Sequence, residues 1–270
     1  MGRCNCRPWG SLVVAQHATG AGGAKASTAG LWVAQEKIHG AQLVIGVEGG
    51  QAFFGKRKAW LADGDAFFGW QLLRRELAAQ ALAMRDALRL ATSDRIYFYG
   101  ELFGGHYPHA SVAAVPGMAP VQTGIWYAPD IRWCPFDAVL QPAGSPVEDA
   151  QWVGHAELRA ASLAANALSP PVLGRGRKSE LHGLAVRFGT KVPTLLGLPE
   201  LPSNWAEGLV LKPEASTPVH ARAVEKRKIE EFDEKQFDQS EAWDPHQFIA
   251  FDDLQAWAQK LVNPARIASA

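Results

Sequence analysis

The sequence predicts an α+β fold with antiparallel sheets, because strand-like runs and helical stretches mix without the regular alternation that builds a parallel sheet. Short apolar or alternating runs at residues 31–34 and 42–47 flank a turn at His39-Gly40, and this pattern predicts strand, tight turn, strand. Residues 71–90 carry leucine, alanine and methionine at helical spacing, which predicts the clearest helix of the chain. Further strands are expected at residues 95–102, 131–140 and 209–211.

Three other elements are expected. Phe53-Phe54 and residues 59–61 suggest a hairpin around Gly55. Residues 147–168 have a largely helical pattern, and residues 252–262 predict a helix near the C-terminal end.

The chain is expected to have three parts: a flexible leader at residues 1–30, one folded domain at 31–240 and a short helical tail at 241–270. The first acidic residue is Glu36, and the residues before it are rich in Gly, Ala, Ser and Thr with a few basic residues. Such a composition is permitted in an organellar transit peptide and is equally that of an unstructured tail. Both interpretations stay open.

The bulk composition excludes several classes. The chain has 27 basic and 27 acidic residues, so no overall basic field draws it to nucleic acid, and any site for a polyanion must be built locally. Three cysteines cannot form a disulfide framework, which favours a reducing, intracellular compartment, either cytoplasmic, nuclear or organellar. No apolar run approaches the roughly 20 residues of a membrane span, so no membrane partner is expected.

Four short segments have the residue types of a reactive site. The first is Glu36-Lys37-Ile38-His39-Gly40, a lysine between a predicted strand and a turn. The second, residues 99–105, has an acid at the end of an apolar strand. The third, residues 207–212, begins with an acid at a turn and ends with a lysine. The fourth is Lys226-Arg227-Lys228, with Phe232 just beyond it.

The spacing of these residues indicates which of their side chains lie on the same face of a strand. Residues two apart in a strand share a face, so Lys226 and Lys228 point the same way and Arg227 points the other way. Lys37 and His39 share a face for the same reason. These segments would thus supply one amine, two carboxylates and several cations, a set suited to phosphoryl transfer, where catalysis rests on positioning and charge stabilisation.

A lysine is normally protonated and a poor nucleophile. Burial and neighbouring cations lower a lysine pKa by up to about 3–5 units, so the lysines of the third and fourth segments would activate Lys37. Glu101 and Glu207 suit a divalent metal, the hydroxyls of a ribose, or both. Each segment alone has an ordinary alternative, because a lysine at a strand end or a run of charges is usually a solvated surface. The order of all four together carries the hypothesis.

These segments resemble the motifs of the covalent nucleotidyltransferases, the superfamily of ATP-dependent ligases and mRNA capping enzymes. More narrowly, they resemble the RNA ligases of the phage second-RNA-ligase type and the kinetoplastid RNA-editing ligases. The resemblance rests on residues 36–40 with their His39, on residues 100–108, and on Leu196-Gly197-Leu198-Pro199 leading into Ala206-Glu207-Gly208. It covers roughly residues 31–235 and implies an ATP-grasp-like nucleotidyltransferase domain, with antiparallel sheets flanking an ATP cleft.

The resemblance implies a role for each matching residue. Lys37 attacks the α-phosphate of ATP and holds AMP through a phosphoramide bond, and His39 lies at the phosphates. Arg57 contacts the ribose or the phosphate end, and Glu101 binds the ribose hydroxyls. Phe136 stacks on adenine, although a core aromatic is the ordinary alternative.

The remaining roles follow in the same way. Glu207 is the metal-linked carboxylate, with Mg²⁺ or Mn²⁺ as the expected ion, and Lys212, Lys226 and Lys228 bind phosphate. The implied catalytic residues are Lys37, His39, Glu207 and Lys228. The implied ATP-binding residues are Glu36, Ile38, Arg57, Glu101, Phe136, Lys212 and Lys226.

The resemblance also implies the substrate. AMP would pass to an RNA 5′-phosphate, and a 3′-hydroxyl would displace it, sealing a nicked RNA duplex or RNA ends bridged by a template. About forty residues follow Lys228, which is too few for an OB-fold. A lone catalytic domain is therefore expected, with a protein partner that supplies grip on the RNA.

Two features depart from the family pattern. Gln42 stands where the family commonly has Asn, and residues 109–133 contain an insertion-like stretch rich in Pro and Gly, expected to be a surface loop. Alternatives are a DNA ligase, a capping guanylyltransferase, a catalytically inactive nucleotide-binding relative and a pure RNA-binding module. The last would use the cations Arg175, Arg177 and Lys178, which are equally explained as a solvated loop.

Overall fold

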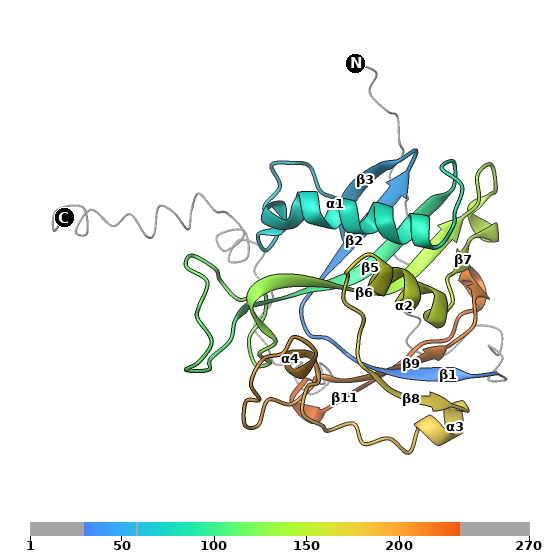
Figure 1. The fold of residues 1–270 in the computed structure, drawn as a ribbon. Coiled ribbons are helices and arrows are strands. Elements are labelled where there is room, and N and C mark those ends of the chain that lie inside the picture. Colours follow the sequence, from blue (N-terminus) through green and yellow to red (C-terminus); the bar gives the residue numbers. More distant parts are fainter. Residues whose placement is uncertain (1–29, 58, 233–270) are drawn as a thin grey trace, which may run out of the picture.

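The computed structural model describes residues 30–57 and 59–232, which form two antiparallel sheets that face each other (Figure 1). One sheet has seven strands in the order β10-β7-β6-β5-β2-β3-β4, and the other has four in the order β11-β9-β1-β8. All neighbouring strands in both sheets are antiparallel. The predicted α+β class with antiparallel sheets is therefore confirmed.

The strands of the seven-stranded sheet are β2 (Ala41–Glu48), β3 (Gln51–Lys56), β4 (Ala59–Trp60), β5 (Arg95–His106), β6 (Ala128–Gln141), β7 (Gln151–Trp152) and β10 (Thr217–Pro218). Those of the four-stranded sheet are β1 (Trp32–Glu36), β8 (Val172–Gly176), β9 (Gly208–Pro213) and β11 (Glu225–Lys228). The helices are α1 (Trp70–Ala87), α2 (His155–Ala164), α3 (Lys178–Leu181) and α4 (Val192–Leu195), with short 3-10 turns η1 (Val147–Asp149), η2 (Val219–Ala221) and η3 (Glu230–Phe232).

The turn at His39-Gly40 differs from a simple hairpin. The strands on either side of it do not pair with each other, because β1 lies between β8 and β9 while β2 lies between β3 and β5. Residues 37–40 therefore carry the chain from one sheet to the other. All five residues of β1 are buried, so this strand needs a neighbour on each side, and a hairpin with β2 would supply only one.

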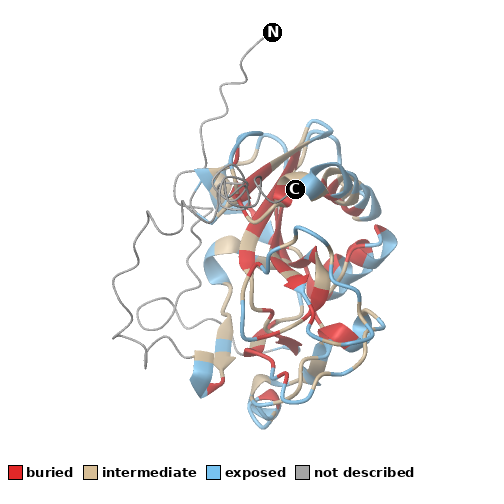
Figure 2. Cartoon of the chain, turned by 90° about the vertical axis from the view of Figure 1, so that its left-hand side faces the viewer, coloured by how far each residue is buried: buried red, intermediate tan, exposed pale blue. Residues whose placement is uncertain are grey.

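The seven-stranded sheet separates an apolar face from a mixed face. On β5, Ile96, Phe98 and Leu102 belong to the large hydrophobic cluster under α1 and α2. The alternate residues Tyr97 and Tyr99 belong to a different cluster on the opposite face. This two-residue alternation is that of a strand covered on both sides, and Figure 2 shows buried residues concentrated along the strands.

The four-stranded sheet has the same division. Trp32, Ala34, Leu209 and Leu211 pack with Leu181 of α3 on its outer face. The alternate residues of β1 and β9 therefore face the seven-stranded sheet. This inward face is mixed, since it carries the buried polar side chains of Gln35 and Lys212 beside the buried Val33.

A buried ion triad joins the two sheets. Lys212 of β9 donates to the Asp137 carboxylate of β6 at 2.8 Å, and Arg222 binds the same carboxylate oxygen at 2.5 Å. The Arg222 guanidinium also lies 4.2 Å from the centre of the Trp152 ring. Although burial raises the pKa of Asp137, the charges of Arg222 and Lys212 outweigh it and lower this pKa to about 2.

Several predicted elements are adjusted. The helix predicted for residues 147–168 begins only at His155, because Pro146 and Gly154 interrupt the pattern and η1 and β7 precede it. In the hairpin of β3 and β4, Gly55 is paired with Trp60 and Lys56 with Ala59, so the chain turns after Lys56 and not at Gly55. A Cβ on Gly55 would lie 2.8 Å from the Trp60 ring, so this glycine admits the indole within the hairpin.

Other predicted helices and strands are confirmed, and some lie outside the described residues. The clear helix is α1, and β5 and β6 are longer than predicted. Strand β8 has no counterpart in the prediction. Residues 107–127 form a loop without helix or strand, as expected for most of the insertion. The predicted leader, helix 252–262 and tail lie outside the described residues. No helix in the described part of the chain is long and apolar enough to cross a membrane.

We expect Asp137→Asn to lower the free energy of unfolding by about 3–5 kcal/mol at pH 7, because it leaves two buried cations without their carboxylate. The folded-state pKa of Asp137, about 2, lies below its ordinary value of 3.8. Its stabilisation is therefore present above about pH 4 and lost as the pH falls toward 2, so wild type and variant should converge in acid. Urea unfolding at several pH values measures this.

Asp130→Asn is the matched control. Asp130 pairs with Arg132, but these side chains are 36% and 45% exposed, so the change should cost no more than about 1 kcal/mol. Equal losses for the two variants would contradict the structural role of the triad.

Candidate active site

The crossing segment between the sheets places Lys37 against a buried carboxylate. The Lys37 Nζ lies 2.6 Å from Oε2 of Glu207, and their side chains are 17% and 3% exposed. Lys37 follows β1, and Glu207 precedes β9, the neighbour of β1. Two residues far apart in the chain thus meet at one end of the four-stranded sheet, and the lysine is not a solvated surface residue.

Glu207 gathers three positive or hydrogen-bonding groups. Besides Lys37, its Oε1 lies 3.2 Å from Nζ of Lys228, and its Oε2 lies 3.5 Å from Nδ1 of His39. Burial alone raises the pKa of Glu207, but the contacts with His39 and Lys37 outweigh it and lower this pKa to about 2. Glu207 therefore remains a carboxylate and holds these groups together.

The backbone around Glu207 explains why its position is so well defined. Lys37 N–H donates to the Gly208 carbonyl at 2.9 Å, and Ile229 N–H donates to the Glu207 carbonyl at 3.0 Å. Gly208 has φ +146°, and a Cβ there would lie 2.0 Å from the Arg227 carbonyl oxygen. Only glycine allows β11 to come this close, and with β11 comes Lys228.

A second carboxylate, Glu101, approaches from the seven-stranded sheet. Burial raises its pKa to about 7; the charge of Glu207 acts in the same direction, whereas Lys37 and Lys226 oppose it. Glu101 also accepts a hydrogen bond from the Gly40 backbone. A Cβ on Gly40 would lie 1.9 Å from the Leu102 carbonyl oxygen, so glycine is required where the crossing segment meets β5.

Lys226 and Arg227 lie as the strand pattern predicts. Lys228 binds Glu207, so Lys226, two residues before it in β11, lies on the same side of the strand, facing the site. Burial lowers the pKa of Lys226, and the charges of Lys37 and Lys228 lower it further. Arg227 points away and donates to the His182 carbonyl at 2.9 Å. Within residues 30–57 and 59–232, Lys226 has no ion pair, which leaves its ammonium available to an anionic ligand.

Lys212 and Phe136 lie in a different part of the space between the sheets. The Lys212 ammonium binds Asp137 and the Phe136 carbonyl oxygen, and it does not join the cations around Glu207. These contacts hold Lys212 beside Phe136, and its predicted contact with phosphate stays a prediction. Phe136 is half-buried against the cluster that contains Tyr99 and Trp152.

The other predicted ATP-binding residues are less central. The Glu36 carboxylate accepts hydrogen bonds from the Thr190 hydroxyl and from Lys191 N–H (2.8 Å), and burial raises its pKa to about 7. Ile38 is buried among apolar side chains. Arg57 is exposed on the β3–β4 turn and makes no ion pair with any described residue. The side chains of Glu36 and Ile38 are thus enclosed by protein on either side of Lys37 in the chain. Their predicted contacts with ATP, and that of Arg57, stay predictions.

Sequence reasoning did not identify some residues that support the site. The Tyr127 hydroxyl accepts a hydrogen bond from His39 N–H at 2.9 Å, and Tyr127 is fully buried. Thr190 and Lys191 hold Glu36 as described. Each lies far from Lys37 in sequence, so no local spacing could have indicated them. Gln42 lies opposite Glu101 in the pairing of β2 and β5, so their side chains share a face.

The cations considered for an RNA-binding module are already paired. Arg175 lies 3.1 Å from Glu214, Arg177 pairs with Glu180, and Lys178 lies 3.0 Å from Glu225. A cluster neutralised in this way gives little net attraction for a polyanion. The cations around Glu207 are the better candidates.

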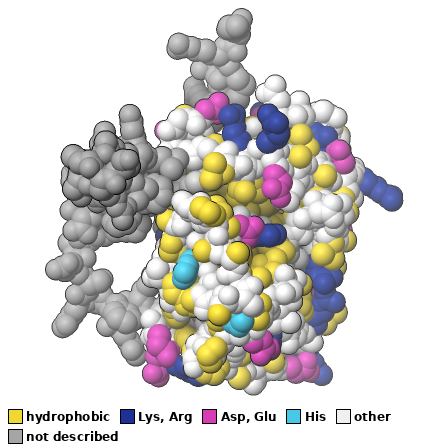
Figure 3. All heavy atoms as spheres, turned by 60° about the vertical axis from the view of Figure 1, so that its left-hand side comes forward, with side chains coloured by type: hydrophobic (Ala, Val, Ile, Leu, Met, Phe, Trp, Pro, Cys, Tyr) yellow, Lys and Arg dark blue, Asp and Glu magenta, His cyan; other side chains and the backbone are white. Residues whose placement is uncertain are grey.

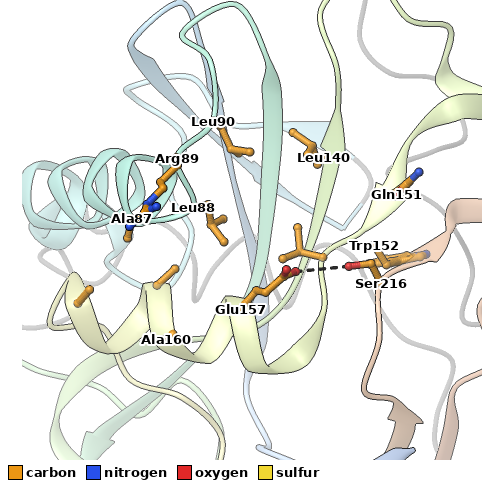
Figure 4. Close-up of a pocket in the computed structure, with 13 residues that line it drawn as sticks. Ala87, Leu88, Arg89, Leu90, Leu140, Gln151, Trp152, Glu157, Ala160 and Ser216 are labelled. Atoms are coloured by element: carbon orange, nitrogen blue, oxygen red, sulfur yellow. Dashed lines mark hydrogen bonds between the residues drawn. The ribbon is translucent and has the colours of Figure 1, made fainter. Parts of the chain in front are cut away.

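Two cavities lie away from these residues. The larger, of about 530 Å³, lies between α1 and α2 and is lined by residues such as Leu88, Leu140 and Glu157, which bonds to Ser216 (Figure 4). None of the predicted site residues lines it. The smaller, of about 240 Å³, lies around Arg132. Figure 3 shows a further part of the surface, where hydrophobic side chains surround a hollow in which an acidic and a basic side chain lie next to each other.

The carboxylates fit a magnesium-type ion better than a metal held by protein alone. No group of three His, Cys, Asp or Glu side chains suited to a metal occurs among the described residues. Glu101 and Glu207 interact electrostatically across the site. Mg²⁺ is commonly bound by one or two carboxylates together with substrate phosphates, which matches this donor set.

Fold and site together define an α+β protein with a lysine–carboxylate centre between two antiparallel sheets. Comparison with known proteins identifies the family: the RNA ligase family model matches residues 30–229, and the chain belongs to this family.

Two mitochondrial RNA-editing ligases of Trypanosoma brucei brucei are similar to it. RNA-editing ligase 2 is 31% identical over 204 residues, covering 67% of this chain and 48% of that protein. RNA-editing ligase 1 is 30% identical over 208 residues, covering 67% and 44%. The chain thus spans about half the length of these relatives.

Solved structures of a Naegleria gruberi RNA ligase also overlap with the chain. One with PPi has 14% identity and a TM-score of 0.49, and a mutant with ATP and Mn has 13% identity and a TM-score of 0.49. Both comparisons cover 77% of this chain and 52% of the other.

Glu101→Gln should make the protein more stable than wild type at pH 8 and leave it unchanged at pH 4. Since the pKa of Glu101 is raised to about 7 in the folded state, the folded protein retains a proton that the unfolded chain loses above about pH 4.5. Stability is therefore lost as the pH rises through 7, and glutamine removes this loss. Thermal unfolding between pH 4 and 8 measures the difference.

Glu200→Gln, at an exposed position, is the control and should follow wild type at every pH. A constant difference between Glu101→Gln and wild type across the range would contradict the raised pKa.

Proposed function

We propose that this chain is the catalytic part of an ATP-dependent RNA ligase, and that Lys37 forms the covalent lysyl-AMP intermediate. The observation that carries the proposal is the 2.6 Å contact between Lys37 and the buried Glu207, with Lys228 on the other oxygen of that carboxylate. Family membership makes nucleotide transfer to RNA the reaction to expect of such a centre.

The first step consumes ATP. The Lys37 ammonium first loses a proton to solvent water and leaves Glu207. Its amine then attacks the α-phosphorus; an N–P bond forms, the bond to the leaving oxygen breaks, and pyrophosphate departs. Lys226 and Lys228 offset the charge of the phosphates, because preorganised cations stabilise the negative charge that develops during transfer. Glu101 and Glu207 would hold Mg²⁺ or Mn²⁺, which would screen the phosphate oxygens.

The later steps join RNA. A 5′-phosphate oxygen of the RNA attacks the phosphorus of lysyl-AMP and releases Lys37, which gives an adenylylated RNA end. The 3′-hydroxyl then attacks the RNA phosphorus, so that a phosphodiester forms and AMP leaves. In the other part of the space between the sheets, Phe136 would stack on the adenine, with Lys212 and Asp137 fixing the backbone behind it.

Substrate and partner are further parts of the proposal. A nicked RNA duplex, or ends bridged by a template, is the substrate class favoured by the resemblance to the editing ligases. Because the chain spans about half the length of these relatives, we propose that a protein partner or additional chain supplies grip on the RNA. Complete sealing of nicks by the purified chain at nanomolar concentration would argue against this requirement.

Incubation with ATP labelled on the α-phosphate and Mg²⁺ should give a labelled protein band on a denaturing gel. Lys37→Ala should abolish the label, because it removes the nucleophile. Lys228→Ala should reduce the rate of labelling by about 10²-fold, the usual effect of removing one charge-stabilising group. EDTA should also prevent labelling.

Lys178→Ala is the matched control, because Lys178 lies over the Trp32 ring on the outer face of the four-stranded sheet. It should be labelled like wild type. Absence of label in wild type would indicate an inactive nucleotide-binding relative. Label from GTP in place of ATP would indicate a capping enzyme, and sealing of DNA nicks but not RNA nicks would indicate a DNA ligase.

Localisation to an organelle is proposed for the chain from the composition of residues 1–30 and from the names of the mitochondrial relatives. A fluorescent protein carrying residues 1–30 should accumulate in mitochondria, and replacement of Arg3 and Arg7 by serine should reduce import. Diffuse fluorescence of the unchanged fusion would favour the unstructured-tail interpretation.

A further inference from the structure

A short turn after β11 lies directly over the site. Ile229 is buried and its N–H binds the Glu207 carbonyl, while Phe232 N–H donates to the Ile229 carbonyl at 3.0 Å. Between them, Glu231 forms an ion pair with Arg187. The turn is therefore held to the rest of the protein by Ile229 and by Glu231, and Phe232 lies beyond the residues that the family model matches.

This turn brings an aromatic ring against His39. The rings of Phe232 and His39 have centroids 5.0 Å apart and planes inclined at 60°, a tilted arrangement typical of aromatic pairs. Phe232 is half-buried against the cluster of Ile38 and Tyr127. A Cβ built on Gly124 would lie 3.5 Å from Phe232 Cζ, so the ring lies next to the loop between β5 and β6.

His39 is held from two further directions. The Tyr127 hydroxyl binds its backbone N–H, and its Nδ1 faces Glu207 at 3.5 Å. The hydrogen bond to Tyr127 fixes the backbone of His39, but the imidazole can still rotate about its side-chain bonds. Among the aromatic residues of the described ranges, Phe232 is the one whose ring packs on the imidazole.

We propose that Phe232 is a positioning residue that keeps the His39 imidazole directed at Glu207, so that the turn after β11 completes the active site. The catalytic consequence of this inference rests on the proposed function, whereas the orientation of the His39 ring does not depend on it. Without the ring, the imidazole is free to rotate and Nδ1 leaves Glu207. The reaction step that uses His39 then slows, because misplacement of a reacting group by about 1 Å costs up to about 10²-fold in rate.

The geometry is tested by NMR of the protein without substrates. An aromatic ring at 5.0 Å should displace the His39 ring-proton resonances, which are assigned by their loss in His39→Ala. Phe232→Leu should return these resonances toward ordinary histidine values, whereas Phe232→Tyr should preserve them. Unchanged His39 resonances in Phe232→Leu would overturn the inference, whatever reaction the protein performs.

The catalytic consequence is tested by a double-mutant cycle. Single-turnover rates of lysyl-AMP formation, of transfer to RNA and of strand joining first identify the step that His39→Ala slows. Phe232→Leu should slow the same step by about 10- to 100-fold, and Phe232→Tyr should restore most of the rate. In the His39→Ala background, Phe232→Leu should have no further effect, because a residue that acts through His39 is silent once His39 is gone.

Phe188→Leu is the matched control, because Phe188 is also half-buried but packs on the outer face of the four-stranded sheet. It should match wild type in every step. Independent, multiplicative effects of His39→Ala and Phe232→Leu on the rate would overturn the positioning role. A fall in the thermal stability of Phe232→Leu that accounts for all of its lost activity would also overturn it. Failure of wild type to form lysyl-AMP would reject the proposed function alone, since the NMR result still decides the geometry.

Discussion

The site depends on one buried carboxylate. Glu207 is 3% exposed, and an isolated charge so placed would be costly, so it is stable only because Lys37, Lys228 and His39 surround it. The same contacts draw together the segment after β1, the start of β9 and the end of β11. Removing that charge would leave two lysines facing each other without compensation, and the segments that carry them would lose their common contact.

The electrostatics of the site follow from the unequal surroundings of its two acids. Cations close to Glu207 lower its pKa to about 2, whereas burial dominates for Glu101 and raises its pKa to about 7. One acid is thus a permanent anion that organises lysines, and the other titrates near neutrality. Binding of a triphosphate with its metal would redistribute these charges, because the lysines that now neutralise Glu207 would gain a second anionic partner.

The charge pattern of the whole chain is consistent with a local site. Basic and acidic residues balance, and the outer cations Arg175, Arg177 and Lys178 are neutralised by neighbouring carboxylates. Lys226 has no such ion-pair partner within the described residues, and its side chain is exposed. An anion would therefore be attracted to the space between the sheets more than to the outer surface.

Sequence by itself determined which residues belong together chemically and how they point within their own strands. The alternation in β11 places Lys226 and Lys228 on one face and Arg227 on the other, because neighbouring side chains of a strand alternate. The sequence also showed glycine at positions 40 and 208, next to predicted turns. The structure explains why glycine is needed there, because a Cβ built on Gly40 or Gly208 would lie 1.9 or 2.0 Å from a backbone oxygen.

Tertiary structure decided which strands meet, because local spacing does not specify a partner across a sheet or between sheets. For this reason the pattern around His39-Gly40 suggested a hairpin, whereas β1 and β2 lie in different sheets. Lys212, predicted to bind phosphate, pairs with Asp137, since the opposite sheet presents that carboxylate to it. Tyr127 and Phe232 reach His39 from 88 and 193 residues along the chain, distances that only packing brings within contact.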